Sequence, residues 1–234
     1  MGSEELKETV GRKAAGLVKN NMTIGLGTGS TVFYTIQELG ARIKKEGLKF
    51  KAVPSSKDTE QKAKAAGIEI IPFEQLEKTK IDLAIDGADE VDKELNLIKG
   101  GGGALLREKR IAYKAKRFAV VVDESKLSDI LGRFPVPVEV KQDKWEFVKA
   151  ELEKIGARVK LRERANSEQR IANSQFVTDN GNYILDSKFD LIIKPKTVEE
   201  IINGIPGVIE NGIFRKEKVS EVLVGTEAGV KIKK

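Results

Sequence analysis

The residues best suited to chemistry lie close together, between positions 86 and 109. This segment contains Asp86, Asp89, Lys99, Glu108 and a run of glycines at 100–103. Consecutive glycines destabilise regular structure by about 0.5–1 kcal/mol each relative to alanine, so folding alone does not favour them. Their unobstructed N–H groups do form a good concave site for an anion. The segment therefore predicts an anion site with carboxylates and an amine beside it.

Each of these features also has an ordinary structural explanation. Asp86-Gly87 after a strand is a common turn signal, a glycine run can be a flexible connector, and Glu108 could pair on a helix surface with Arg107 or Lys109. Their combination at the end of one apolar strand and the start of one helix matches the place where open α/β sheets bind ligands. We therefore prefer the functional interpretation.

The residue types that are missing restrict the chemistry. The chain has no cysteine and no histidine, which excludes disulfides, thiolate chemistry, the usual neutral-pH base and the commonest metal ligand. Acid–base chemistry must then fall to carboxylates, lysines or tyrosines. We expect no metal ion and no cofactor.

A second glycine-rich segment, residues 25–31, lies between an apolar run and an amphipathic pattern that contains Val32, Ile36 and Leu39. Free N–H groups and hydroxyls at the start of a helix suit a phosphate. Ser30 stands where a dinucleotide fingerprint has its third glycine, the next strand ends without an acid, and no Gly-Lys-Ser/Thr is present. We therefore do not expect NAD or ATP at this segment. We expect a small phosphoester or a sugar hydroxyl instead.

Strand and helix patterns alternate along the first part of the chain, which predicts a mostly parallel, doubly wound sheet. The predicted strands are 22–26, 49–53, 68–71, 81–85 and 118–122, and the predicted helices are 4–19, 32–43, 58–66 and 104–116.

The pattern changes at Gly132. Prolines at 135 and 137 predict an edge strand over 136–140, and Asp179-Asn180-Gly181 predicts a hairpin between strands 175–178 and 183–186. With helices at 143–155 and 197–203 and a strand at 157–161, the order is typical of a small α+β domain. Strands at 208–209, 213–214 and 219–224 could rejoin the first sheet. We expect one domain from 1–131 and 207–234, and a smaller one from 132–206.

Composition and charge limit the class of protein. The chain has 234 residues and a formal charge of +6, with basic and acidic residues interspersed, so we expect no nucleic-acid partner; the excess charge also suits a phosphorylated substrate. No apolar run approaches the ~20 residues that span a bilayer. The start lacks the apolar core of a signal peptide. We expect a cytoplasmic protein with no membrane partner.

Four motifs together resemble type-A ribose-5-phosphate isomerase. They are GTGST at 27–31, DGADEVD at 86–92, KGGGGALLREK at 99–109 and DESKLSDILGRFPVPVEV at 123–140. The resemblance implies an aldose–ketose isomerase that interconverts D-ribose 5-phosphate and D-ribulose 5-phosphate through an enediolate, without a metal. It also implies a Rossmann-like three-layer α/β domain, a smaller inserted ferredoxin-like α+β domain involved in oligomerisation, and a homodimer or homotetramer.

The same resemblance implies roles for individual residues. Glu108 would be the base that moves the proton between C1 and C2, and Lys99 would stabilise the enediolate oxygens. Asp86 and Asp89 would contact substrate hydroxyls and assist ring opening and the proton transfer between O1 and O2. The implied substrate-binding set is Thr28, Gly29, Ser30, Thr31, Asp86, Gly87, Ala88, Asp89, Lys99, Gly100, Gly101, Gly102 and Lys126. Which groups hold the phosphate stays open. Lys7 could approach it, or could be a solvated helix lysine.

Two alternatives remain open from the sequence. Coenzyme A transferases share the general architecture and use a glutamate nucleophile; acyl-coenzyme A would then label Glu108, although the chain is short for such an enzyme. A sugar-phosphate-sensing or nucleic-acid-associated module would instead bind its ligand without turnover. No helix-turn-helix segment supports that second alternative.

Overall fold

The computed structural model describes residues 2–164 and 175–234. Its largest element is a seven-stranded sheet in the order β14-β13-β7-β4-β1-β2-β3. All neighbouring strands are parallel except β13 and β14, which are antiparallel. The strands are β1 (Thr23–Leu26), β2 (Lys51–Pro54), β3 (Glu69–Ile70), β4 (Leu83–Gly87), β7 (Phe118–Asp123), β13 (Glu221–Thr226) and β14 (Gly229–Lys233).

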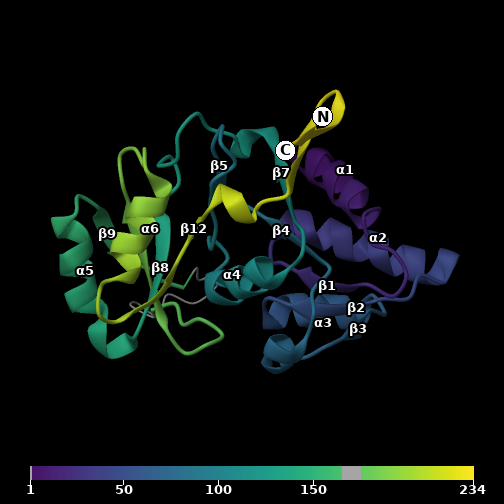
Figure 1. Ribbon diagram of the computed structural model, residues 1–234, viewed down its shortest axis with the longest axis horizontal. Coiled ribbons are helices and arrows are strands. Elements are labelled where there is room, and N and C mark those ends of the chain that lie inside the picture. The colour runs from purple at the N-terminus through teal and green to yellow at the C-terminus, as the bar shows by residue number, and fades with distance from the viewer. Residues whose placement is uncertain (1, 165–174) are drawn as a thin grey trace.

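Helices cover both faces of this sheet (Figure 1). One face packs against α1 (Ser3–Ala15), α2 (Ser30–Glu46) and α3 (Lys57–Ala65), and the other against α4 (Leu105–Lys114) and the short 3₁₀ helix η1 (Phe73–Lys78). Because both faces are covered, the inner strand β7 is buried along its whole length and is almost entirely apolar. The predicted three-layer α/β architecture is confirmed. Within the described residues, no helix has the length and apolar character needed to cross a membrane.

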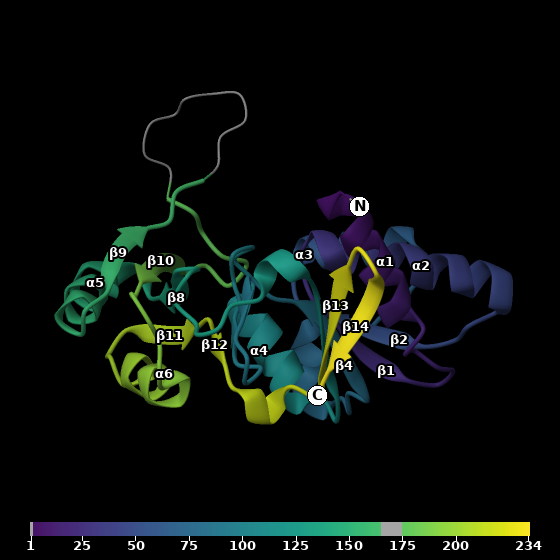
Figure 2. The ribbon, with the colours of Figure 1, turned by 90° about the horizontal axis from the view of Figure 1, so that it is seen from above.

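A four-stranded antiparallel sheet forms a second unit beside the first (Figures 1 and 2). It contains β8 (Val136–Val140), β9 (Arg158–Leu161), β10 (Tyr183–Lys188) and β11 (Val208–Asn211), with helices α5 (Trp145–Lys154) and α6 (Pro195–Asn203). The strand order is β11-β8-β10-β9. This is a βαββαβ arrangement of the ferredoxin-like kind, as expected.

A small three-stranded sheet joins two parts of the chain: β5 (Glu90–Val91) and β6 (Leu97–Ile98) come between β4 and β7, and β12 (Ile213–Phe214) comes between β11 and β13. The strand order is β12-β6-β5. The pairing of β12 with β6 brings residues from near the end of the chain against the strand that leads directly into Lys99. This sheet therefore helps to set the position of Lys99.

The prediction that 136–140 is an edge strand is wrong. β8 lies inside the four-stranded sheet, between β11 and β10. In a strand, the C=O and the nitrogen of one residue face the same side. The Pro137 C=O accepts a hydrogen bond from Gly212 N at 2.8 Å, just past the end of β11, so the nitrogen that lacks a hydrogen also faces that end and not β10. Pro137 therefore removes no hydrogen bond from the ladder with β10.

The predicted hairpin is also corrected. The turn at Asp179-Asn180-Gly181 exists, but within the described residues 175–178 form only a single bridge, between Gln175 and Glu163. Both edges of β10 are already paired, with β8 and with β9, so a strand before the turn has no edge to join.

The strands after residue 207 do not all return to the first sheet. Val208–Asn211 is the fourth strand of the small sheet and pairs with β8, whereas the expected boundary at 206/207 assigned it to the first domain. Gly207, at φ 103°, turns the chain back from α6. Only β13 and β14 join the seven-stranded sheet.

The junction between the units contains a fully buried carboxylate that gives the first prediction. Glu90 accepts hydrogen bonds from the backbone N–H groups of Gly132, Arg133 and Phe134, at 2.8–3.2 Å. Glu90→Ala leaves these donors unsatisfied, so we expect a loss of about 3 kcal/mol or more in the free energy of unfolding, measured by urea denaturation. Glu94→Ala is the matched control, because Glu94 is exposed and forms a surface ion pair with Lys216; it should change stability by about 0.5 kcal/mol or less. Equal losses in the two variants would contradict the assignment.

Candidate active site

A cleft opens at the carboxyl ends of the adjacent strands β1, β4 and β7. The chain continues from β1 to β2 on one side and from β4 to β7 on the other, so the cleft lies where the strand order reverses, the usual ligand site of such sheets. The residues that line it are Lys7, Thr28, Gly29, Ser30, Thr31, Val32, Gly87, Ala88, Asp89, Lys99, Gly100, Gly101, Gly102, Glu108, Val122, Asp123 and Lys126.

Asp86, near the end of β4, lies behind the cleft and not on its surface. Its Oδ1 accepts hydrogen bonds from Thr28 N at 3.1 Å and Gly87 N at 2.7 Å. Its Oδ2 lies 2.9 Å from Lys99 Nζ. Gly27 makes this position possible, because a Cβ there would lie 1.8 Å from Asp86 Oδ1. Asp86 thus ties the β1 turn, the β4 end and Lys99 together.

Lys99 is buried between two carboxylates. Besides Asp86, its Nζ lies 3.3 Å from Glu108 Oε2 and donates to Gly87 O at 2.6 Å. The ammonium also lies 5.3 Å from the ring centroid of Phe214 on β12. Burial disfavours the charge of Lys99, but the carboxylates of Asp86 and Glu108 outweigh that effect and raise the pKa of Lys99. Lys99 is therefore a permanent cation at the floor of the cleft.

Glu108, in the first turn of α4, is buried and lines the cleft. Its Oε2 lies 3.3 Å from Lys99 Nζ but receives no hydrogen bond from any described residue. Burial, and then the charge of Asp86, raise the pKa of Glu108 to about 8. A carboxylate with such a pKa is a much stronger base than an exposed one, and it can take up and return a proton near neutral pH.

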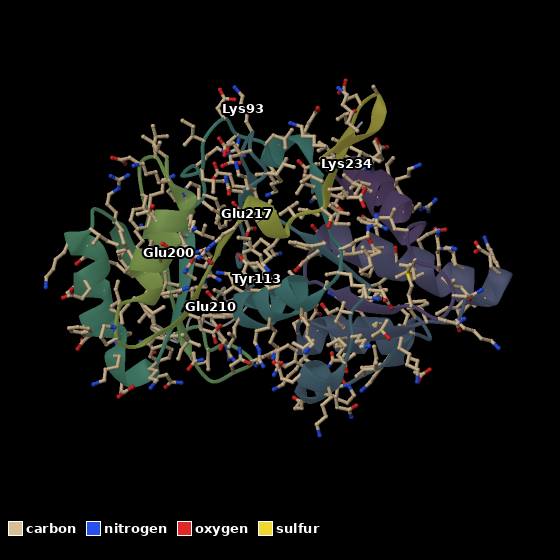
Figure 3. All side chains as sticks on the ribbon, viewed as in Figure 1. Lys93, Tyr113, Glu200, Glu210, Glu217 and Lys234 are labelled. Carbon is tan, nitrogen blue, oxygen red and sulfur yellow. The ribbon has the colours of Figure 1, made fainter. Side chains whose placement is uncertain are left out.

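The helix that carries Glu108 is fixed from its far side. Lys109, also buried, forms ion pairs with Glu199 of α6 at 3.1 Å and with Glu210 of β11 at 2.8 Å. Figure 3 shows Glu210 close to Tyr113, one turn further along α4. The four-stranded unit therefore holds α4 in place. Removal of Lys109 would leave Glu210 without this ion pair, whereas Glu199 would keep its pair with Arg215.

Hydroxyl groups support the β1 turn. Thr28 Oγ1 lies 2.8 Å from Ser55 Oγ and 2.9 Å from Ser56 Oγ, both at the end of β2. Thr59 Oγ1 donates to Gly27 O at 2.8 Å. The turn leads into Gly29, at φ 120°, which precedes α2 and leaves the first N–H groups of that helix without a side-chain cap. This uncapped end, with Ser30 and Thr31, is suited to an anion.

The glycine turn after Lys99 forms the opposite wall of the cleft. Gly100 and Gly103 have φ values of 102° and 83°, which side chains rarely adopt. Gly101 N donates to Asp89 Oδ2 at 2.7 Å. The N–H of Gly102 has no acceptor among the described residues and lies in the cleft wall.

The structure brings nearly the whole predicted set together. Every residue of the expected substrate-binding set lines the cleft except Asp86, which contacts it through Lys99. Lys7, whose role was open, also lines it, with its Nζ 2.7 Å from Glu4. Sequence reasoning missed Asp123, which is the last residue of β7. An acid at the end of a fully apolar strand was the available signal. The described residues contain no group of three or more possible protein ligands for a metal ion.

Comparison with known proteins finds similar proteins of one family. Residues 51–229 match the family model of ribose 5-phosphate isomerase A (phosphoriboisomerase A). The chain is 50% identical to a ribose-5-phosphate isomerase A from Gluconobacter oxydans, over 96% of this chain and 94% of that protein. It resembles the solved ribose 5-phosphate isomerase A of Methanocaldococcus jannaschii (TM-score 0.92, 42% identity) and a D-ribose-5-phosphate isomerase in complex with phospho-erythronic acid (TM-score 0.94, 43% identity), each over 100% of both chains.

The close approach of Gly27 to Asp86 gives the second prediction. Gly27→Ala should displace the Asp86 carboxylate and with it Lys99, so we expect kcat to fall by about 10²-fold or more. The measurement is turnover of ribose 5-phosphate beside the melting temperature. Gly204→Ala is the control, because a Cβ at Gly204 would meet nothing closer than 3.4 Å. Normal turnover in Gly27→Ala would show that the position of Asp86 is not needed.

Proposed function

The chain belongs to the ribose 5-phosphate isomerase A family, and we propose that it carries out the family's interconversion of ribose 5-phosphate and ribulose 5-phosphate through an enediolate, with Glu108 as the base. The observation that carries the assignment of the base is a buried glutamate that lines the cleft 3.3 Å from a buried lysine. No other glutamate lines the cleft within the described residues.

The substrate's phosphate is assigned to the uncapped start of α2. The N–H groups and hydroxyls of Ser30 and Thr31 lie there, and Lys7 and Lys126 line the same cleft and add positive charge. Helix N-termini and lysines are common phosphate partners. The reacting end of the sugar then lies toward Lys99, Glu108 and the glycine turn.

The proposed reaction moves two protons, one between carbon atoms and one between oxygen atoms, and creates no net charge. With Oε2 directed at Lys99, Oε1 of Glu108 faces the substrate and removes the proton from C2 of the open-chain aldose. The C–H electron pair becomes the C1–C2 double bond, and the carbonyl electrons move to O1. Lys99 and the Gly102 N–H stabilise the negative oxygens. Glu108 then returns the proton to C1, and a proton passes from O2 to O1 to give the ketose.

Asp86 is assigned a supporting role in this mechanism. It holds Lys99 at 2.9 Å and lies too deep to line the cleft. Its charge also raises the pKa of Glu108, which makes Glu108 a stronger base. Asp89, which does line the cleft, remains the carboxylate assigned to a sugar hydroxyl.

A homodimeric or homotetrameric assembly and a cytoplasmic location are also part of this proposal. Exposed apolar side chains in the four-stranded unit support an oligomer interface there. Leu191 and Ile193, between β10 and α6, are 63% and 75% exposed, and Ile201 on α6 is 47% exposed. The division into a larger domain and a smaller inserted domain belongs to the same proposal.

The third prediction tests the base. Glu108→Gln keeps the size of the side chain but cannot accept the proton, so we expect turnover to fall by about 10³-fold while ribose 5-phosphate still raises the melting temperature. The assay follows ketose formation in EDTA, and the wild type should remain active there. Glu94→Gln, on the surface, is the matched control. Near-normal turnover by Glu108→Gln would end the assignment.

The fourth prediction concerns pH. A base must be deprotonated to act, so kcat/KM should fall about tenfold per pH unit below the Glu108 pKa of about 8. Asp86→Asn removes a negative charge that raises this pKa, so the acid limb of the profile should move to lower pH, although kcat also falls. The values of kcat/KM are compared above pH 7, because the phosphate of the substrate itself titrates near pH 6 and would change the profile there. An unmoved limb would show that Glu108 is not the titrating group.

A further inference from the structure

An arginine of the four-stranded unit contacts the glycine turn of the cleft. Arg162 directly follows β9, and its Nη1 donates to Gly100 O at 2.9 Å and to Gly101 O at 3.1 Å. We propose that Arg162 is a positioning residue that aims the Gly102 N–H at the substrate's reacting oxygens. This inference rests on the proposed function of the cleft.

Arg162 is itself held rigidly. Its Nε donates to Asp186 Oδ2 at 2.9 Å and its Nη2 to Asp186 Oδ1 at 2.5 Å, which is a two-point pair with a carboxylate on β10. Both side chains are mostly buried, at 13% and 26% exposure. The backbone N–H of Arg162 also donates to Ile184 O. A planar guanidinium fixed at two points presents its remaining N–H groups in one direction only.

The planarity of the peptide bond transmits this direction to the cleft. In a trans peptide unit, the C=O of one residue and the N–H of the next point in opposite directions. Arg162 holds the carbonyls of Gly100 and Gly101 on its own side, so the N–H groups of Gly101 and Gly102 must point away from it. The first of these donates to Asp89 at 2.7 Å, and the second is left for the substrate.

The glycine turn cannot fix this direction alone. Glycine has the widest backbone freedom of any residue, and four occur in a row here. The turn has one internal hydrogen bond, from Gly103 N to Gly100 O at 3.0 Å, which leaves the Gly101–Gly102 peptide plane free to rotate. The contact from Arg162 to Gly101 O is the one that sets this plane.

The fifth prediction compares Arg162→Met with Arg158→Met. Arg158 is the matched control: it is the first residue of β9, it pairs with Asp190, and it is exposed. For Arg162→Met we expect kcat to fall by about 10- to 100-fold while KM changes by less than about threefold. Inhibition by phospho-erythronic acid, whose carboxylate resembles the two enediolate oxygens, should weaken by a similar factor. Inhibition by inorganic phosphate should stay the same. Arg158→Met should match the wild type in all four measurements.

Arg162→Lys separates orientation from charge. Lysine keeps the charge but cannot hold Asp186 at two points and both carbonyls at once, so it should be nearly as impaired as methionine. If Arg162→Met should not fold, judged by its melting temperature, Arg162→Lys alone decides the question. Normal kcat in a folded Arg162 variant, or equal weakening of phosphate and phospho-erythronic acid, would overturn the proposal. A wild type without isomerase activity would instead overturn the proposed function.

Discussion

The structure depends on one buried interaction, the pairing of Lys99 with Asp86 and Glu108. A buried ammonium is costly, and two carboxylates around it leave one negative charge that no ion pair cancels. The group is tolerable because Asp86 also accepts two backbone hydrogen bonds. Burial raises the pKa of both carboxylates, and of these two only Glu108 lines the cleft, where it can exchange a proton with a substrate. The burial that is energetically costly is therefore also what makes Glu108 a strong base.

Three sheets have to meet for this interaction to form. Asp86 comes from the seven-stranded sheet, Lys99 follows β6 of the three-stranded sheet, and α4 with Glu108 is anchored by Lys109 to residues of the four-stranded unit. β12, which returns from near the end of the chain, pairs with β6 and places Phe214 against the Lys99 ammonium. The second unit is therefore a structural support of the site as well as a candidate oligomer interface.

Sequence reasoning located the local parts of this arrangement and missed the non-local ones. The parallel sheet and the residues that line the cleft follow from apolar runs and from motifs within short segments. The position of β8 inside its sheet does not, because it depends on where β11 ends relative to Pro137. β11 lies beyond the expected domain boundary at 206/207. Its place in the small sheet also depends on a distant pairing, with β8. The depth of Asp86 behind the cleft was not visible either, since the motif around Asp86 does not reveal which residues cover it.

The same distinction applies to catalysis. In the proposed mechanism, residues 86–109 supply the base, the cation and the oxyanion donors, and a short segment with many glycines can approach a substrate closely. That freedom of the backbone is also a disadvantage, because an N–H group stabilises a developing charge only when its direction is set before the reaction. Rigid groups elsewhere must then fix the direction of the N–H group. A guanidinium that a carboxylate holds at two points is among the most rigid side-chain arrangements. On this view the polar residues of the second unit belong to the reaction as much as the residues of the motif do.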